Sequence, residues 1–274
     1  MASQRDKAVR FRELHVPGSP LVLANVWDVA GARVVAATGA PAVATTSAGV
    51  AWALGAPDGD RLDRADALAL IRRVARALDV PVTVDVEGGF GATPEEVADT
   101  VEAVIEAGAV GINIEDGDRH PADFAERLAA ARHAADRAAV PLYINARTDV
   151  YFKGIGEPEG RLDETLARAA RYLEAGASGI FVPFATTPDD VASLTRGIAA
   201  PVNVLAAAGA PSVAELAALG VARVSLGSNI AAAVYALVRR AAEELATTGT
   251  YASLAETIPY QELNRLLTDT APPR

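Results

Sequence analysis

The sequence contains no cysteine and little that marks a secreted, membrane-bound or nucleic-acid-binding protein. Without cysteine there can be no disulfide, no thiolate metal site and no cysteine nucleophile. Only Lys7 and Lys153 are lysines, and the formal net charge is −10, so no basic stripe is available to neutralise a phosphate backbone. No apolar run approaches the roughly 18 residues of a membrane span, and the first residues, MASQRDKAVRFRELH, are charged where a secretory signal would be apolar. We therefore expect a cytoplasmic protein with neither nucleic acid nor a membrane as its partner.

Apolar residues make up 51% of the 274 residues, which is enough for a large core. Barrels of alternating strands and helices commonly use about 250 residues as one domain. We therefore predict a single barrel domain over residues 1–274, with 250–274 as a helical tail. The tail carries apolar residues without a strand to cover, which indicates an interface between copies of the chain. These residues are Leu254, Ile258, Tyr260, Leu263, Leu266 and Leu267.

Short β-branched apolar runs alternate with amphipathic segments along the chain, as in parallel βαβ units. The predicted strands cover residues 21–28, 42–46, 81–87, 111–116, 142–148, 179–184, 201–206 and 223–227. Apolar residues at helical spacing predict helices between them, for example over 63–78 and 93–108, the latter bounded by Thr93 as N-cap and by Gly108. An open doubly wound sheet would show a GxGxxG turn after the first strand, which instead runs into DVAGARVVAATG. The fold class is therefore predicted as α/β, a (β/α)₈ TIM barrel with extra C-terminal helices.

Acidic residues follow the predicted strands at their C-terminal ends, where the active sites of such barrels lie. Asp85 and Glu87 are two residues apart in a predicted extended segment, so both side chains are expected to point into the barrel mouth. Glu115 follows one strand later at a similar level. Such neighbouring charges raise one another's pKa, and a divalent cation would relieve the repulsion. Oxygen ligands without cysteine or paired histidines favour Mg²⁺ or Mn²⁺ over Zn²⁺, whereas the alternative is that each acid is a solvated loop residue or a helix cap.

One arginine and one histidine are candidates for substrate binding and proton transfer. Arg147 ends the fifth predicted strand and could hold a carboxylate or phosphate through two donors, or could instead balance Glu115 or Asp149 in a salt bridge. His120 lies close behind the fourth predicted strand and could act as an acid or base near neutrality, or could be a solvated loop residue. His15 is expected at the surface.

Three segments, VDVEGGFG, GINIED and INARTD, follow one another in this order on the third, fourth and fifth predicted strands. They resemble the signature segments of the isocitrate lyase and phosphoenolpyruvate mutase superfamily, and the resemblance extends over about residues 21–243. The resemblance implies that Asp85 contacts Mg²⁺, directly or through water. It also implies that Glu87, Glu115 and Asp58 complete the metal shell.

Small residues follow the second predicted strand in the loop TTSAGVAWALGAPDG, whose backbone N–H groups could approach an anionic ligand. The alternative is an ordinary loop, since glycine and serine occur in most loops. The resemblance implies that Ser47, Ala48 and Gly49 hold the carboxylate end of the substrate and that Arg147 is the substrate-binding arginine. We also assign Asn203, on the seventh predicted strand, to the substrate site.

Members of this superfamily act on small 2-oxo or 2-hydroxy acids, making or breaking a C–C or P–C bond while a metal stabilises an enolate. Its lyase branch carries a cysteine in a gating loop after the fourth strand, whereas this chain has no cysteine and passes through the short segment GDRHPADF into a helix. We predict a Mg²⁺-dependent lyase that cleaves or decarboxylates a small 2-oxo or 2-hydroxy (di)carboxylic acid, with Arg147, His120 and Tyr151 as catalytic residues. The alternatives are a P–C bond mutase or hydrolase acting on a phosphonopyruvate-like substrate, and a barrel that binds an anionic metabolite without catalysis. The resemblance also implies a homotetramer, a dimer of dimers with exchanged C-terminal helices.

Overall fold

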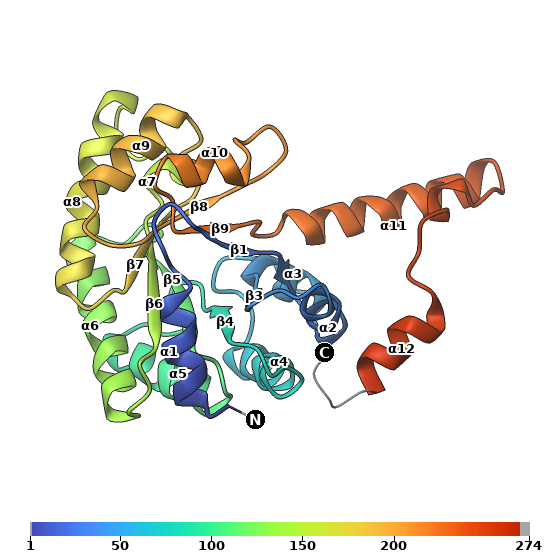
Figure 1. Cartoon of the computed structure of the whole chain (residues 1–274), viewed down its shortest axis with the longest axis horizontal. Helices are drawn as coiled ribbons and strands as arrows, with labels where there is room; N and C mark the ends of the chain where they lie inside the picture. Colours follow the sequence, from blue (N-terminus) through green and yellow to red (C-terminus); the bar gives the residue numbers. More distant parts are fainter. Residues whose placement is uncertain (1, 269–274) are drawn as a thin grey trace.

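The computed structural model describes residues 2–268, so residues 269–274 of the predicted tail lie outside the described part of the chain. All pairings between its strands are parallel, and the sheet curls until β1 lies beside β9 and β2 beside β3 (Figure 1). The strands are β1 (Leu21–Leu23), β2 (Asn25–Val26), β3 (Val43–Thr45), β4 (Val82–Asp85), β5 (Gly111–Glu115), β6 (Tyr143–Arg147), β7 (Gly179–Val182), β8 (Val202–Leu205) and β9 (Arg223–Ser225). Because β1 and β2 are two halves of the first predicted strand, all eight predicted strands are present. The predicted (β/α)₈ barrel is confirmed.

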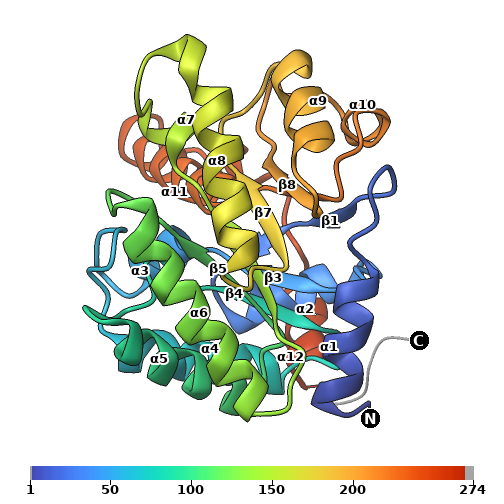
Figure 2. The ribbon, with the colours of Figure 1, turned by 90° about the vertical axis from the view of Figure 1, so that its left-hand side faces the viewer.

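Helices surround the curled sheet, and α6, α8 and α9 lie side by side along one flank (Figure 2). The helices are α1 (Gln4–Glu13), α2 (Val29–Ala37), α3 (Ser47–Ala53), α4 (Arg64–Arg76), α5 (Pro94–Glu106), α6 (Pro121–Arg137), α7 (Val150–Lys153), α8 (Arg161–Glu174), α9 (Pro188–Gly197), α10 (Val213–Ala218), α11 (Asn229–Thr247) and α12 (Tyr260–Thr268), with short 3₁₀ turns η1 (Pro158–Gly160) and η2 (Ala252–Leu254). The predicted ends of α5 are confirmed, since Thr93 accepts a hydrogen bond from the N–H of Glu96 and Gly108 has a left-handed φ of 104°. None of the helices within residues 2–268 is both long enough and apolar enough to cross a membrane.

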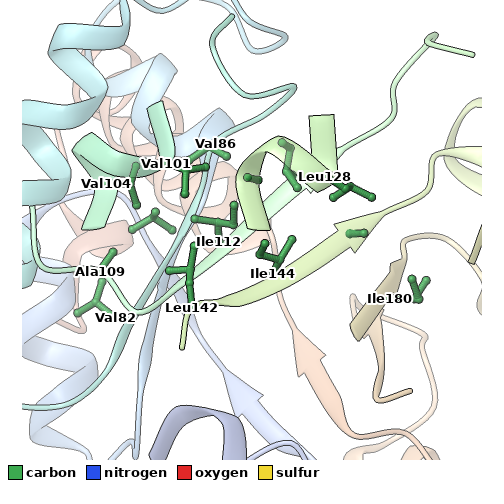
Figure 3. Packing of buried hydrophobic residues seen from close by; sticks show 14 of the residues in the cluster. Val82, Val86, Val101, Val104, Ala109, Ile112, Leu128, Leu142, Ile144 and Ile180 are labelled. Atoms are coloured by element: carbon green, nitrogen blue, oxygen red, sulfur yellow. The ribbon is translucent and has the colours of Figure 1, made fainter. Parts of the chain in front are cut away.

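The main core lies between the strands and the helices outside them. Ile112, Ile144 and Ile180 come from the neighbouring strands β5, β6 and β7, and pack in one buried cluster with Val101 and Leu128 from α5 and α6 (Figure 3). Strands that are buried on both faces read as continuous apolar runs, which is why periodicity located them in the sequence. This packing fixes the strands so that their C-terminal ends share one edge.

The N-terminal helix α1 covers the opposite end of the barrel. Phe11 of α1 packs against Tyr143, and the His15 ring stacks on Tyr143 with 3.8 Å between the ring centroids. His15 is therefore buried, and burial lowers its pKa to about 3. The expectation of a surface His15 is wrong, because a hydrophobic helix face draws this segment onto the barrel.

The C-terminal arm departs from the compact barrel. Helix α11 extends away from it, and α12 returns to contact α2 (Figure 1). Ala231 is the one buried residue of α11. On β1, Val22 points outward and is 44% exposed. Exposed apolar residues of α11 are Val234, Tyr235, Val238 and Leu245.

Candidate active site

Three predicted site residues end neighbouring strands on one edge of the sheet: Asp85 on β4, Glu115 on β5 and Arg147 on β6. The Nη1 atom of Arg147 lies 2.6 Å from Oε2 of Glu115, and its Nε donates to Oδ1 of Asp149 at 2.6 Å. The salt bridges that the sequence left open as an alternative are therefore both present. The third nitrogen, Nη2, makes no hydrogen bond with the described residues, so this edge of the guanidinium keeps its donors for a ligand, while Cζ lies 4.9 Å from the centre of the Phe152 ring.

Glu87 does not lie where strand alternation placed it. Strand β4 ends at Asp85, and Glu87 has a left-handed φ of 51°, so the extended segment that we predicted does not reach it. Its N–H donates to Oδ1 of Asp85 at 3.1 Å. Its Oε2 accepts from the N–H groups of Gly59 and Asp60, whereas Oε1 is buried without a hydrogen-bond partner. One carboxylate oxygen thus holds a loop, and the other needs a partner that the described residues do not supply.

Burial and crowding raise the pKa of several carboxyl groups in this cluster. Burial raises the pKa of Asp85, and the positive charge of Arg147 offsets this only in part. Burial likewise raises the pKa of Glu87 to about 7 and that of Glu115 to about 8, and the charges of Asp58 and Asp85 contribute to both increases. The nearby arginine charges therefore do not offset the burial and mutual repulsion of these acids.

These residues fit a hard divalent cation. The donors are carboxylate oxygens, and one of them, Oε1 of Glu87, is buried and unpartnered. Within residues 2–268, no three His, Asp or Glu side chains lie close enough to form a metal site by themselves. Mg²⁺ commonly binds one or two carboxylates directly and keeps several waters, which other carboxylates can hold. A cation here would be held by the predicted ligands Asp85, Glu87 and Glu115 mainly through its waters, and Asp58, which is exposed in the loop before α4, could contribute only in the same way.

The small-residue segment forms a helix and not the loop that we predicted. Ser47, Ala48 and Gly49 make the first turn of α3, whose N-cap Thr46 makes no side-chain hydrogen bond to them. First-turn N–H groups have no partner within their helix, so they can bind an anion. Gly49 is required by packing, because a Cβ there would lie 2.7 Å from Cγ2 of Thr46 and 3.0 Å from Cβ of Trp27.

Ser47 shares a small enclosed space with the acidic cluster. The cavity measures about 10 Å³ and is lined by Ser47, Asp85 and Glu87, together with apolar residues that include Leu62 and Phe90. This space is about the size of one water. The structure thus places Ser47 of the predicted anion-binding segment beside Asp85 and Glu87, two of the four predicted metal ligands, whereas Glu115 and Asp58 do not line this space.

Three other predicted site residues are engaged elsewhere. His120 is exposed and caps α6, where its Nδ1 accepts from the N–H of Ala122 at 3.2 Å. The Tyr151 hydroxyl donates to Asp190 at 3.1 Å, and burial together with that negative charge raises its pKa to about 12. Asn203 lies inside the barrel, where its amide hydrogen-bonds to four groups.

The partners of the Asn203 amide are all internal. Its Oδ1 accepts from Nδ2 of Asn145, and its Nδ2 donates to the carbonyls of Val204 and Arg223 and to the hydroxyl of Ser225. Both N–H donors of this buried side chain are therefore used within the protein.

Two aspartates near Arg147 were not assigned to the site from the sequence. Asp149 is buried beside Arg147, and its N–H donates to Oδ1 of Asp116 at 2.8 Å. Asp116 is fully buried and also accepts from Arg168 and from the Tyr172 hydroxyl. This network fixes Asp149, and through it the Arg147 side chain. The position of Asp149 two residues after Arg147, at a strand end, was the signal available in the sequence.

Comparison with known proteins agrees with this geometry. The family described as phosphoenolpyruvate phosphomutase matches residues 11–246. The chain belongs to that family. The 2-methylisocitrate lyase of Escherichia coli strain K12 is 33% identical over 62% of this chain and 60% of the relative. A crystal structure of a protein from Burkholderia cenocepacia J2315 is 47% identical, with a TM-score of 0.84 over 87% of this chain and 99% of the other.

A further solved structure names the superfamily. It is a 2,3-dimethylmalate lyase, described as a phosphoenolpyruvate mutase/isocitrate lyase superfamily member, with a TM-score of 0.82 and 25% identity over 95% of this chain and 94% of the other. The predicted superfamily is therefore confirmed, and with it the prediction of an enzyme of the isocitrate lyase and phosphoenolpyruvate mutase type. The family is one of lyases and mutases that act on small molecules.

Proposed function

We propose that the chain is a Mg²⁺-dependent lyase (Mn²⁺ being the substitute metal) that cleaves or decarboxylates a small 2-oxo or 2-hydroxy (di)carboxylic acid through an enolate. One observation carries the proposal: the buried carboxylates of Asp85, Glu87 and Glu115 have raised pKa values, only Glu115 of them pairs with an arginine, and Oε1 of Glu87 is buried without a partner. A bound Mg²⁺ would stabilise the negative charge that develops on the 2-oxo oxygen. The lyases among the relatives support the same chemistry.

The residues of the chain divide the remaining tasks. Asp85, Glu87, Glu115 and Asp58 hold the cation. The free Nη2 of Arg147 binds a substrate carboxylate, because the ion pairs to Glu115 and Asp149 fix the plane of the guanidinium.

We assign the remaining substrate contacts to the N-terminus of α3. The N–H groups of Ser47, Ala48 and Gly49 bind the other end of the acid. Proton transfer remains assigned to His120 or Tyr151, and the geometry favours neither, since one caps a helix and the other is bound to Asp190.

The test is incubation of the protein with Mg²⁺ and separately with oxaloacetate, a 2-methylmalate-like acid and phosphonopyruvate, followed by NMR of the products. We expect products from a C–C substrate that disappear in EDTA. A product from phosphonopyruvate alone would identify a P–C mutase or hydrolase, as the family description also allows. Binding of these acids without any product would identify a metabolite-binding barrel.

We further propose that the chain acts in the cytoplasm as one barrel domain, assembled into a dimer of dimers through residues 250–274 and α11. The support is the apolar surface that the isolated chain leaves in contact with water. Val238 of α11 is 59% exposed, and Tyr251 and Tyr260 beyond it are 71% and 82% exposed. Surfaces of this kind usually mark interfaces.

A further inference from the structure

Two segments at the barrel mouth hold each other through hydrogen bonds that run in both directions. The Glu87 carboxylate accepts from the N–H of Gly59 at 2.9 Å and from the N–H of Asp60. In return, the Asp60 carboxylate accepts from the N–H of Gly88 at 3.1 Å. The loop between α3 and α4 is thereby fixed to the segment after β4 at Glu87, which lines the small cavity and whose Oε1 is buried without a partner.

A third segment joins this arrangement from the short connection between β5 and α6. Nη2 of Arg119 lies 3.4 Å from Oδ2 of Asp60. Both side chains lie against Gly88, because a Cβ at that position would stand 2.5 Å from Oδ2 of Asp60 and 2.5 Å from Nη1 of Arg119. The φ of Gly88 is outside the left-handed region, so a methyl group there would act by pushing aside the ends of these two side chains.

The backbone at Asp60 and at Glu87 adopts a conformation that residues other than glycine rarely adopt. Asp60 and Glu87 have left-handed φ values of 56° and 51°, although neither is a glycine. Such conformations persist where surrounding contacts fix them, and they gather at functional sites. Here Glu87 accepts from the N–H of Asp60, and Asp60 accepts from the N–H of Gly88 directly after Glu87, while Asp85 binds the N–H of Glu87.

We infer that Asp60 is a positioning residue for Glu87, and that Arg119 fixes the Asp60 carboxylate for that task. The inference rests on the proposed function, in which Glu87 helps to hold the divalent cation. Asp60 does not touch the cation; it determines where the free oxygen of Glu87 stands. The short connection after β5 therefore contributes to the site through Arg119.

If Asp60 and Arg119 formed only an ion pair at the surface, a different result would be expected when Asp60 is removed. The side chains of Asp60 and Arg119 are 34% and 28% exposed, and exposed ion pairs contribute little to stability. If that were their whole role, removing Asp60 would change neither metal affinity nor the order of the loop. Residues that orient metal ligands typically change metal affinity by about 10–100-fold when they are removed.

The first measurement is Mg²⁺ affinity by calorimetry on the full chain. We expect Asp60→Ala to weaken binding by about tenfold or more, and Asp60→Asn to retain most of it, because the amide oxygen still accepts from Gly88. Gly88→Ala should resemble Asp60→Ala, since its methyl group displaces both side chains without removing a charge. Gly160→Ala is the matched control, because a Cβ there meets nothing within 4 Å.

The second measurement needs no metal: hydrogen exchange of the Gly59 and Asp60 amides in EDTA, read by mass spectrometry. We expect faster exchange in Asp60→Ala and Gly88→Ala than in the wild type and in Gly160→Ala, at an unchanged melting temperature. Equal protection of these amides in all variants would overturn the inference, as would wild-type Mg²⁺ affinity in Asp60→Ala and Gly88→Ala. A wild-type protein that binds no Mg²⁺ would refute the proposed function, and faster exchange in the two variants would still support the positioning of Glu87 by Asp60.

Discussion

Asp85→Asn should increase the stability of the metal-free protein while removing its Mg²⁺ site. Relative to the ordinary value of 4.5, the pKa of Glu87 is raised to about 7 and that of Glu115 to about 8. At about 1.4 kcal/mol per pKa unit, ionising both groups costs the fold several kcal/mol. Burial is the largest cause of these raised pKa values, and the charge of Asp85 is a smaller one. Removing that charge should therefore increase the free energy of unfolding by about 1 kcal/mol. For a chain of this size, that corresponds to an increase in Tm of about 2–4 °C.

The size of this stabilisation by Asp85→Asn depends on pH. A carboxyl group whose pKa is higher in the folded state stabilises the fold below its unfolded value and loses that contribution as pH rises through the folded value. For Glu87 and Glu115 this window extends from the ordinary value of 4.5 to about 8. The gain in Asp85→Asn should therefore be larger at pH 8.5, where both glutamates are ionised, than at pH 5, where both are protonated and only the cost of ionising the buried Asp85 itself is removed.

The assay combines thermal unfolding in EDTA at these two pH values with calorimetric titration of Mg²⁺ and oxalate. Oxalate resembles the planar enolate of a 2-oxo acid and chelates through two oxygens, so it should need the metal to bind tightly. Asp136→Asn, an exposed aspartate on α6, is the control for loss of a surface charge. A lower Tm for Asp85→Asn at pH 8.5, or undiminished binding of Mg²⁺ and oxalate by that variant, would refute the reasoning. Equal oxalate binding by the wild type in excess EDTA would refute the metal site itself.

Two further predictions concern the substrate and the assembly. Arg147→Lys should lower kcat/KM by about a hundredfold, because lysine keeps the charge but loses the planar arrangement of donors that binds a carboxylate, and Tm should change little. Unchanged kcat/KM together with a large fall in Tm would make Arg147 a structural residue. Light scattering at micromolar concentration should show a homo-oligomer, and Val238→Asp on the exposed face of α11 should reduce its mass; a monomer in the wild type would refute the proposed assembly.

The positions of the strands could be predicted because burial on both faces leaves a continuous apolar run in the sequence. The places of Asp85, Glu115 and Arg147 followed from that, since each stands where such a run ends. Strand positions could not, however, predict the direction of a side chain that comes after the end of a strand. Glu87 shows why: alternation holds only while the backbone is extended, and its left-handed φ follows from contacts with a loop about thirty positions earlier.

Other differences have the same physical origin. Ser47 begins a short helix although its segment was predicted to be a loop, and Gly49 in the first turn lies so close to Trp27 and Ala231 that a Cβ there would meet both. Asn203 was assigned to the substrate from its place on a strand, but its amide completes a network with residues from distant strands. Contacts between residues so far apart leave no periodic mark in a single sequence.

The barrel is joined at one place by a side chain in place of a regular strand ladder. Where the first strand is interrupted at Ala24, Oδ1 of Asn25 accepts from the N–H groups of Leu226 and Gly227, each at 2.9 Å, and its Nδ2 donates to the carbonyl of Thr45. The first two of these bonds join residues 201 and 202 positions apart. During synthesis the first strand therefore leaves the ribosome long before its last neighbour exists, and the seam at Asn25 can form only when nearly the whole chain has been made. Closure of the barrel is a late event with a large entropic cost, which slows folding compared with proteins of local topology.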